Sequence, residues 1–564
     1  MKRLLKNGTI VNVFTGELIK TNVLFENGVI LGVDDYGDNE ADEVIDAAGK
    51  YICPGFIDGH IHIESTMLTC PEFAKTAVSH GTTAVIADPH EIANVSGKDG
   101  LRYMLESSEG LPLTVYFVIP SCVPATGFDE SGAVLSADDI EEFYSEGRVL
   151  GLGEVMNYVG VVAGDDELEK KIKSALSRGL VVNGHAPLLS GKPLDKYISA
   201  GIGDDHECSS ADEAKERIRK GQRIMIRQGT AARNLSGLIS LFDDPWEQRC
   251  LLVTDDKHPA DLISNGHIDS IIRSAVQMGK SAVTGIRMAT LHAAECFGLK
   301  NTGAVAPGYK ADMLVLDDLD KVIVHDVYKN GEKVVSDGKA LCFDMPRISE
   351  ALEKKVRSSF NLPMLSSSDF VVDYNGKRKC HIISLVDGQL LTDDLISDID
   401  FDRNNGIDIE RDILKIAVIE RHHNTGHIGN AFIKGIGLKE GAIASSVAHD
   451  SHNLIVIGTN TDDMAFAANR IRELGGGIVS VKNGKVVAEM PLPIGGLMSC
   501  EAAEKAAEEN EKVRKSVYSL GVPEGFEPFM IMSFLSLPVI PHLKLTTKGL
   551  VDVDTQSEVP LAAE

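Results

Sequence analysis

Basic side chains are scarce in this sequence. Its 564 residues include 56 lysines and arginines against 83 aspartates and glutamates, so the formal net charge is −27 with histidine neutral. Such an acidic composition argues against general binding to nucleic acid or to anionic membranes, and leaves only a local basic patch open. No stretch approaches the ~20 consecutive apolar residues that a membrane span needs. The first eight residues carry positive charge without a following apolar core, so we expect no signal peptide.

Cysteine pairs of the C-x-x-C type are also missing, and the nine cysteines are an odd number. Stable disulfide frameworks use paired cysteines and occur in oxidising compartments. We therefore expect reduced thiols and a cytoplasmic protein. Hydrophobic residues make up 43% and charged residues 25% of the chain, which is typical of a soluble globular protein.

The length and the strand pattern predict several domains. Apolar strand-like runs alternate with helical stretches through residues 51–300, which favours an α/β fold with a (β/α)8 TIM-like barrel. Short β-rich runs separated by turns occupy residues 1–50 and 301–345, and we expect these two flanks to form one small β-sandwich. Residues 346–362 are predicted to be a charged helical linker, and residues 363–564 a C-terminal α/β domain.

Two histidines, His60 and His62, end an apolar run with the sequence Asp-Gly-His-Ile-His. Side chains two apart on a strand point to the same face, so both imidazoles can reach one cation. Imidazole is a common ligand of zinc, iron and similar metals, and barrel enzymes keep their chemistry at the C-terminal ends of the strands. The pair therefore predicts a metal site, although two such histidines also occur as ordinary surface or core residues.

Four further candidate ligands follow or end later apolar runs: Glu154, His185, His206 and Asp255. One strand-plus-helix unit takes roughly 30 residues, so the spacing places the ligands on strands 1, 4, 5, 6 and 8 of the barrel. Four histidines and two carboxylates suit two divalent ions, with one carboxylate as the bridge. Each residue alone has an ordinary structural explanation, such as a salt bridge for Glu154.

Longer motifs add a resemblance to a known family. Residues 54–65 (Pro-Gly-Phe-Ile-Asp-Gly-His-Ile-His-Ile-Glu-Ser), together with the later Glu, His, His and Asp, resemble the amidohydrolase superfamily. Within it, residues 88–95 (Asp-Pro-His-Glu-Ile-Ala-Asn-Val), 253–256 and 448–454 are similar to the adenine deaminase family of bacteria and archaea. The resemblance covers nearly the whole chain.

The resemblance implies hydrolysis of the small purine base adenine to hypoxanthine and ammonia, in purine salvage or catabolism. It also implies a binuclear centre most active with Mn2+ and able to take Fe2+ or Zn2+, with Glu154 bridging the ions in place of a carboxylated lysine. A metal-activated hydroxide attacks C6 of the purine. We expect Asp255 to accept its proton and pass it to the leaving amine. We also expect a homo-oligomer.

Substrate contacts are predicted at weaker positions. Glu64 lies on the same face as His62 if the strand continues, and there it protonates N1 or holds the ring; an exposed or helix-capping Glu64 is the alternative. His90 and Glu91 line the pocket or support the ligands by hydrogen bonds. In the last domain His449 and His452 close over the barrel mouth and contact purine, with or without a neighbouring subunit, or form a polar interdomain interface. Arg227 contacts the substrate or stabilises its loop.

Two other functions share parts of this pattern. A cyclic amide hydrolase of the same superfamily uses the same metal-activated water, and the ligands alone do not separate it from an adenine deaminase. A non-catalytic assembly protein on the same barrel is the other alternative, and the presence of all six ligands argues against it. The combined pattern H-x-E…P-C-x-x-C is absent, which excludes the small zinc deaminase fold.

Overall fold

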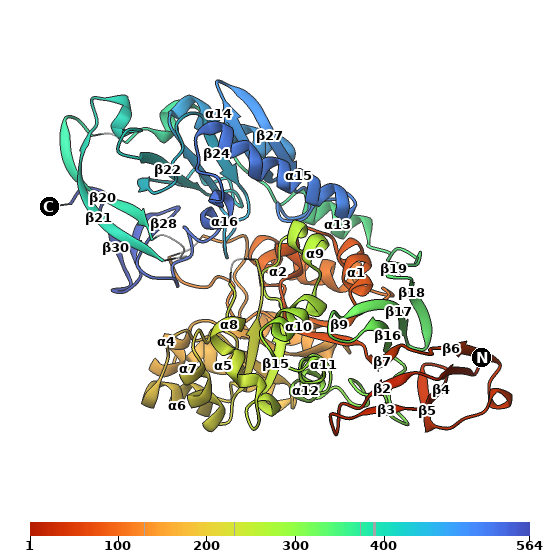
Figure 1. The fold of residues 1–564 in the computed structure, drawn as a ribbon. Coiled ribbons are helices and arrows are strands. Elements are labelled where there is room, and N and C mark those ends of the chain that lie inside the picture. Colours follow the sequence, from red (N-terminus) through yellow and green to blue (C-terminus); the bar gives the residue numbers. More distant parts are fainter. Residues whose placement is uncertain (129, 231, 373, 387–390, 564) are drawn as a thin grey trace.

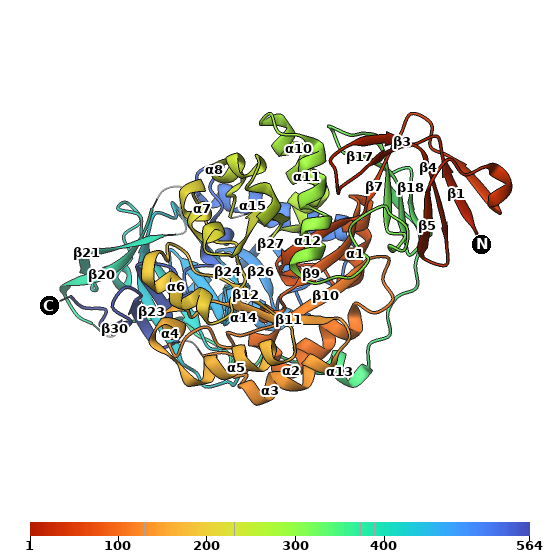
Figure 2. The same cartoon turned by 90° about the horizontal axis from the view of Figure 1, so that it is seen from below.

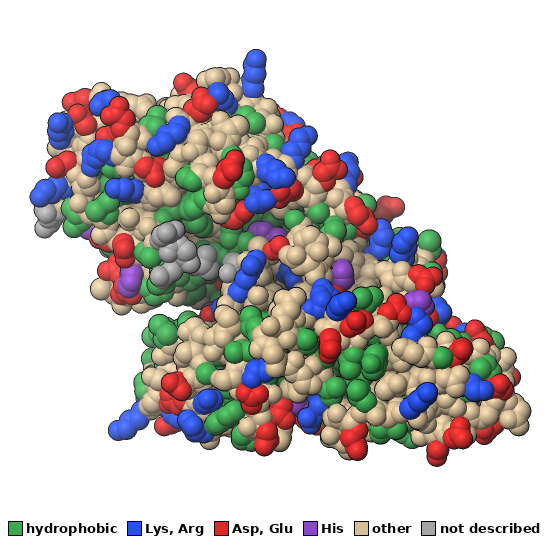
Figure 3. Space-filling view, viewed as in Figure 1, with side chains coloured by type: hydrophobic (Ala, Val, Ile, Leu, Met, Phe, Trp, Pro, Cys, Tyr) green, Lys and Arg blue, Asp and Glu red, His purple; other side chains and the backbone are tan. Residues whose placement is uncertain are grey.

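The computed structural model of the chain describes all residues except 129, 231, 373, 387–390 and 564. The C-terminal part, cyan to blue in Figure 1, lies above the middle of the chain, and the red N-terminal strands lie to one side. The two termini are at opposite ends of the molecule in Figures 1 and 2. Acidic and basic side chains intermingle on the face shown in Figure 3. Among the described helices, none has the length and apolar character needed to cross a membrane.

Parallel strands form the middle of the chain. They make a five-stranded sheet of order β12-β11-β10-β9-β8 and a three-stranded sheet of order β13-β14-β15. Single backbone hydrogen bonds connect the two sheets at both edges: Gly203 N–H donates to Val182 O, and Asp255 N–H donates to His60 O, each at 3.0 Å. The two sheets together therefore form one curled layer of parallel strands, as in a TIM-like α/β domain. The strands are β8 (Phe56–Ile61), β9 (Thr82–Ala87), β10 (Thr114–Ile119), β11 (Val149–Val155), β12 (Val181–Gly184), β13 (Asp204–Asp205), β14 (Arg223–Arg227) and β15 (Cys250–Val253).

Burial on both faces explains why these strands are apolar throughout. All six residues of β9 and all four of β15 are buried, as expected for parallel strands covered on one side by helices and on the other by the interior. Ile86, Val118 and Leu251 pack together in one cluster between the strands. Helices that follow the strands include α1 (Cys70–Ser79), α2 (His90–Ser107), α5 (Asp166–Ser177), α6 (Gly191–Ser199), α7 (Ala211–Arg219) and α10 (Ile268–Gln277).

Strands from both flanks of the middle segment share a sheet. Its order is β19-β18-β17-β16-β7-β2-β3, and its antiparallel pair β7–β16 aligns Pro54 with Met313. A second sheet has the order β5-β4-β1-β6. The segments just before and just after the parallel strands are therefore paired with each other, β7 with β16. The strands are β1 (Arg3–Lys6), β2 (Thr9–Val11), β3 (Leu18–Lys20), β4 (Asn22–Glu26), β5 (Val29–Asp34), β6 (Glu43–Asp46), β7 (Tyr51–Pro54), β16 (Met313–Asp318), β17 (Ile323–Lys329), β18 (Glu332–Ser336) and β19 (Lys339–Ala340).

The C-terminal part is built on an eight-stranded sheet of order β21-β20-β23-β22-β25-β24-β26-β27. Its central strand β22 is buried along its whole length. The helix α14 (Thr461–Leu474) packs on β24, β25 and β26, and α15 (Ala503–Ser516) packs on β27 and on α9 (Pro259–Asn265). The strands are β20 (Lys377–Leu385), β21 (Thr392–Asp400), β22 (Ile413–Ile419), β23 (Ile428–Lys434), β24 (Ala442–Ser445), β25 (Leu454–Gly458), β26 (Gly477–Lys482) and β27 (Lys485–Pro491).

Shorter elements connect and cover these parts. The helix α13 (Glu350–Arg357) lies in the segment expected to be a charged helical linker, and it packs against α2. A separate three-stranded sheet of order β28-β29-β30 contacts β21, β22 and β23 through its strands β28 (Leu543–Thr546) and β29 (Gly549–Asp552). Its third strand is β30 (Ser557–Val559). Residues between α16 (Pro528–Met532) and β28 reach the C-terminal ends of the parallel strands.

Candidate metal centre

The six predicted ligands lie at the C-terminal ends of the parallel strands, on the first, fourth, fifth, sixth and eighth strands. The structure brings all of them together, and all except the half-buried His185 are buried. They are His60 in β8, His62 just after it, Glu154 near the end of β11, His185 after β12, His206 after β13 and Asp255 after β15.

Glu154 lies between two pairs of histidines. Its Oε1 atom is 2.8 Å from His60 Nε2 and 3.0 Å from His62 Nε2. Its Oε2 atom is 2.7 Å from His185 Nδ1 and 3.5 Å from His206 Nε2. A carboxylate that offers one oxygen to each of two imidazole pairs has the arrangement needed to bridge two cations.

Asp255 completes the first of these groups. Its Oδ1 atom is 3.2 Å from His62 Nε2 and 3.8 Å from His60 Nε2. His62 Nδ1–H donates to the Asp88 carbonyl oxygen at 2.9 Å, so the lone pair of His62 is on Nε2, toward the carboxylates. Among the described residues, Glu154 Oε1 and His60 Nε2 have no hydrogen-bond partner although both are buried. Buried polar atoms need a partner, and this donor set of imidazole and carboxylate fits divalent metal ions.

The two carboxylates are held in the ionised form that a metal requires. Burial opposes ionisation of Glu154, but the neighbouring His206 and His60 hold its pKa well below the ordinary value. Burial also opposes ionisation of Asp255, where Arg227 and His62 hold the pKa well below its usual range. Each side chain therefore carries negative charge at neutral pH.

Two residues near the ligands form an ion-pair network that sequence reasoning described only in part. Arg227 Nη1 donates to Asp255 Oδ2 at 2.5 Å and to Glu207 Oε1 at 2.6 Å, and Arg227 Nη2 donates to Glu207 Oε2 at 2.9 Å. Glu207 Oε1 is also 3.3 Å from His206 Nε2. Glu207 was missed by the sequence analysis, and its position directly after His206 was the available signal.

The predicted residues His90, Glu91, His449 and His452 meet beside the metal ligands. Glu91 Oε1 accepts from His449 Nδ1 at 2.5 Å, and Glu91 Oε2 accepts from His452 Nε2. His90 Nε2 is 3.4 Å from Glu91 Oε1, and the His90 ring lies 4.4 Å from the His62 ring. All four residues are buried. A helix N-terminus of the middle segment and a loop of the C-terminal part therefore share one polar cluster.

A cavity of about 110 Å³ connects this cluster with the ligands. Its lining includes polar residues, such as Glu154, Asp255 and His449, and apolar residues. Sequence reasoning missed the apolar residues because hydrophobic side chains in a loop have no distinguishing pattern. They are Met156, Phe534, Leu537, Val539 and Ile540.

Glu64 is placed away from that cavity lining. The strand β8 ends at Ile61, and Glu64 lies in the short 3-10 helix η2 (Ile63–Thr66), so the strand continuation on which its predicted role depended does not occur. Its Oε1 atom accepts from the Ile92 backbone N–H at 3.2 Å. Burial raises its pKa to about 7. The substrate-contact role of Glu64 stays a prediction.

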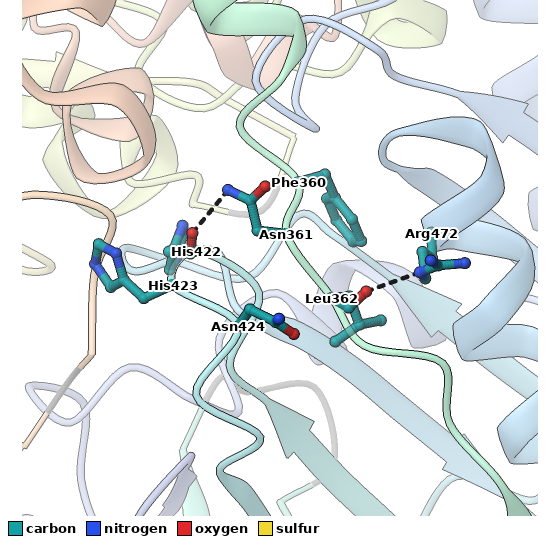
Figure 4. Close-up of a pocket in the computed structure, with 7 residues that line it drawn as sticks. All are labelled: Phe360, Asn361, Leu362, His422, His423, Asn424 and Arg472. Carbon is teal, nitrogen blue, oxygen red and sulfur yellow. Dashed lines mark hydrogen bonds between the residues drawn. The ribbon is translucent and has the colours of Figure 1, made fainter.

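A larger and more open depression of about 660 Å³ lies in the C-terminal part (Figure 4). Asn361 Nδ2 donates to the His422 carbonyl oxygen at 2.8 Å, and Arg472 Nε donates to the Leu362 carbonyl oxygen at 2.7 Å. None of the six predicted metal ligands lines it. The smaller cavity at the strand ends is therefore the candidate functional site.

Comparisons with known proteins agree with this location. Residues 51–338 match the model of the amidohydrolase family, and residues 389–557 match that of the adenine deaminase C-terminal domain. Adenine deaminase 2 of Carboxydothermus hydrogenoformans is 44% identical over 559 residues, covering 99% of this chain and 96% of the relative. Adenine deaminase of Thermosipho africanus is 45% identical over 572 residues, covering 100% and 97%. A solved β-aspartyl dipeptidase from Fervidobacterium islandicum AW-1 is 19% identical, with a TM-score of 0.46 over 61% of this chain and 100% of that one.

Identity of this level over nearly the full length of both chains, with both family models matched in order, shows common descent. The chain belongs to the adenine deaminase family of amidohydrolases.

Proposed function

We propose that this protein hydrolyses adenine to hypoxanthine and ammonia in purine salvage or catabolism. The observation that carries the proposal is Glu154, which offers one oxygen to His60 and His62 and the other to His185 and His206. The adenine deaminase relatives support the choice of adenine as the substrate.

The residues at the strand ends would hold two divalent metal ions. We propose manganese as the ion of the active enzyme, with iron or zinc as replacements. When bound, the pair supplies a hydroxide nucleophile near neutral pH. The proposed ligands are His60, His62 and Asp255 with Glu154 Oε1 for one ion, and His185 and His206 with Glu154 Oε2 for the other.

Asp255 is the proposed proton carrier. It is ionised and lines the cavity, so it is in the correct form to accept a proton from the attacking hydroxide. The same carboxyl group then delivers that proton to the amine that leaves C6. Arg227 holds the second oxygen, Oδ2, and so fixes the direction in which Oδ1 faces the histidines.

The apolar side chains of the cavity are proposed to hold the faces of the purine. A purine is flat, with apolar faces and polar edges, and such ligands bind between apolar side chains with a few polar groups at their edges. Phe534, Leu537 and Ile540 come from the C-terminal part of the chain and face the cavity that the metal ligands line. We propose that His90, Glu91 and His449 form the polar edge; His452 does not line the cavity and reaches it through its hydrogen bond to Glu91, so its predicted direct contact with purine stays a prediction.

We also propose the complete architecture expected from the sequence. The hydrogen bonds at both sheet edges support a closed eight-stranded barrel in residues 51–300. The sheets shared by the two flanks support a β-sandwich from residues 1–50 and 301–345, with residues 346–362 as a linker and 363–564 as the C-terminal domain. The nine unpaired cysteines support a cytoplasmic location. A homo-oligomer remains our proposal for the assembly.

The alternatives are not favoured. Cyclic amide hydrolysis uses the same metal chemistry, but the relatives that match along the whole chain are adenine deaminases. A non-catalytic assembly protein has no need for six converging ligand side chains.

The test is ammonia release from adenine by protein stripped of metal and then reloaded with manganese. We expect hypoxanthine and ammonia in equal amounts from the reloaded protein and neither from the stripped protein. No release from a folded sample containing two ions per chain would reject adenine, and a cyclic amide such as dihydroorotate would then be tried on the same sample.

A further inference from the structure

We infer that His449 is the group that protonates a ring nitrogen of the purine, and that His452 is a positioning residue that acts on His449 through Glu91. The inference rests on the proposed adenine deamination. It gives a loop of the C-terminal part the proton-donor role that was one of the alternatives for Glu64 in the sequence analysis.

The hydrogen bonds of His452 fix which of its nitrogens carries the proton. The Ala448 backbone N–H donates to His452 Nδ1 at 3.1 Å, so Nδ1 bears a lone pair. The proton of a neutral His452 is therefore on Nε2, and it is donated to Glu91 Oε2. Glu91, His449 and His452 are close enough to hold a metal ion, but a ligating Nε2 must be free of its proton. The three residues therefore form a hydrogen-bonded chain.

The same chain fixes the orientation of the His449 ring. Its Nδ1–H donates to Glu91 Oε1 at 2.5 Å, which places Nε2 on the opposite side of the ring. The ring stacks on Phe534, with centroids 4.7 Å apart and an angle of 20° between the planes. His449 and Phe534 line the same cavity as Asp255. Because Glu91 occupies the Nδ1 edge, the Nε2 edge is the part of His449 left for a ligand.

The charges around His449 favour its protonated form. Burial lowers its pKa, but Glu91, Asp256 and Asp450 outweigh burial and raise the pKa to about 9. The other titratable groups facing it are His452 and His258. Burial lowers the pKa of His452 to about 4 despite Glu91, so that ring stays neutral. His449 as an imidazolium and His452 as a neutral imidazole thus both donate to the Glu91 carboxylate, and His90 Nε2 lies 3.4 Å from Glu91 Oε1. A carboxylate orients the catalytic histidine of serine proteases in the same way.

The proton transfers balance with this assignment. As hydroxide adds to C6, the C6–N1 double bond opens and N1 takes the proton from His449 Nε2. Asp255 then moves the hydroxyl proton to the amine, the C6–N bond breaks, and ammonia leaves. N1 keeps its proton in hypoxanthine. The next water gives up one proton to become hydroxide, and that proton restores His449.

Two substitutions of His449 separate the proposed role from a structural one. In His449→Asn the amide nitrogen takes the place of Nδ1 and keeps the bond to Glu91, whereas the Nε2 edge is lost. In His449→Gln the amide lies near the place of Nε2 and the bond to Glu91 is lost. We expect His449→Asn to lower kcat by roughly 10²–10⁴-fold, the range for a general acid. Two ions per chain and an unchanged melting temperature should accompany that loss.

The matched control is His427→Asn, because His427 is an exposed histidine of the same domain that pairs with Glu130. Its kcat should equal that of the unmodified protein. Normal kcat in His449→Asn with the Glu91 bond retained would overturn the inference and leave His449 as a structural partner. If the unmodified protein releases no ammonia from adenine, the proposed function is rejected. That outcome is distinct from normal kcat in His449→Asn, which rejects only the role of His449.

Adenine binding to the metal-free protein gives a readout independent of turnover. Calorimetry at pH 7 should show at least roughly tenfold weaker binding to His449→Asn than to the unmodified protein, since about 1.4 kcal/mol corresponds to a factor of ten. Equal adenine affinities of the two proteins would show that His449 does not contact the purine.

His452 and Glu91 test the positioning role. His452→Gln retains a donor near Nε2 and should keep most of kcat, whereas His452→Ala should lower kcat more than it raises KM. Glu91→Gln removes the charge that keeps His449 protonated, so the loss of activity on the alkaline side should begin at a lower pH. An unshifted pH profile in a folded Glu91→Gln variant would contradict the inference. If His449→Asn does not fold, Glu91→Gln is the variant that tests the role of His449.

Discussion

The two walls of the active-site cavity are built in different ways. On the strand wall, formed by the ends of the parallel strands, Glu154, Asp255 and Arg227 lie in or next to regular structure and form direct ion pairs. On the loop wall the residues come from loops of the C-terminal part, where His449 and Phe534 stack on each other. The strand wall contains mainly charged and imidazole side chains, whereas the loop wall combines His449 and Asp450 with apolar side chains.

This difference separates chemistry from recognition. A group that holds an ion must be placed accurately, and strand ends of a sheet are rigid supports. A group that covers a purine face needs only an apolar surface of the correct shape. We therefore expect substitutions in the strand wall to abolish turnover and substitutions of the apolar residues of the loop wall to weaken binding, with His449, the proposed proton donor, as the exception on the loop wall. Three predictions test this division, from the largest expected effect to the smallest, and a fourth concerns a buried lysine that lines neither wall.

Glu154→Gln should have the largest effect, because it removes the charge shared by both histidine pairs. We expect loss of both ions and a fall in kcat of at least roughly 10³-fold. Metal analysis and ammonia release on the same sample are the measurements. Glu216→Gln, a change to a half-buried carboxylate on α7 that does not line the cavity, is the control and should behave like the unmodified protein. Two tightly bound ions in Glu154→Gln would show that Glu154 is not the bridge.

Asp255→Asn should keep the shape of the strand wall and remove its proposed proton carrier. We expect kcat to fall by roughly 10²–10⁴-fold, with KM for adenine changed little. The variant is reloaded with manganese before assay, so that metal loss and loss of the base are measured separately. Near-normal turnover by the fully loaded variant would exclude Asp255 as the carrier.

Phe534→Ala should act on the loop wall. Loss of an aromatic face from a purine site is expected to raise KM roughly tenfold, which corresponds to about 1.4 kcal/mol, with a smaller change in kcat. Phe360→Ala is the matched control, because Phe360 lines the open depression in Figure 4 instead of the cavity. A fall in kcat without a change in KM would contradict the expectation that the apolar residues of the loop wall act on substrate binding.

Lys415→Met should leave activity unchanged and stabilise the protein. Lys415 is fully buried in β22, its Nζ lies 4.3 Å above the Phe432 ring, and no described residue accepts a hydrogen bond from it. Burial lowers its pKa to about 7. In the unfolded chain Lys415 has its ordinary pKa of 10.5. Between pH 7 and pH 10.5 the unfolded state therefore binds more protons than the folded state. A rise in pH through this range increases the free energy of unfolding.

The pH-dependent part of the stability difference between Lys415→Met and the unmodified protein should thus be largest below pH 7, at about 5 kcal/mol, and decrease toward pH 10. Thermal unfolding followed by calorimetry across this pH range measures it. Lys485→Met is the control, since Lys485 is exposed in the same sheet. A difference that does not vary with pH would show that Lys415 remains charged in the fold.

The sequence predicted the strand wall far better than the loop wall. Apolar runs that end in His, Glu or Asp are recognisable because buried parallel strands need such runs, and the spacing placed Glu154 and His185 on neighbouring strands as observed. The condition attached to Glu64 is not met, because the alternation rule holds only while the strand lasts and β8 ends at Ile61. Phe534 and Glu207 were not found, because contacts between distant loops depend on tertiary packing that no local pattern encodes.

The hydrogen bond between Glu91 and His452 joins residues that are 361 positions apart in the chain. At a synthesis rate of roughly 5–20 residues per second, Glu91 waits roughly 20–70 s for its partner to be made. During this interval Glu91 lacks both of its histidine partners from the C-terminal part. A nascent chain that stops before residue 540 would therefore lack part of the loop wall, so we expect the cavity to be completed only late in synthesis.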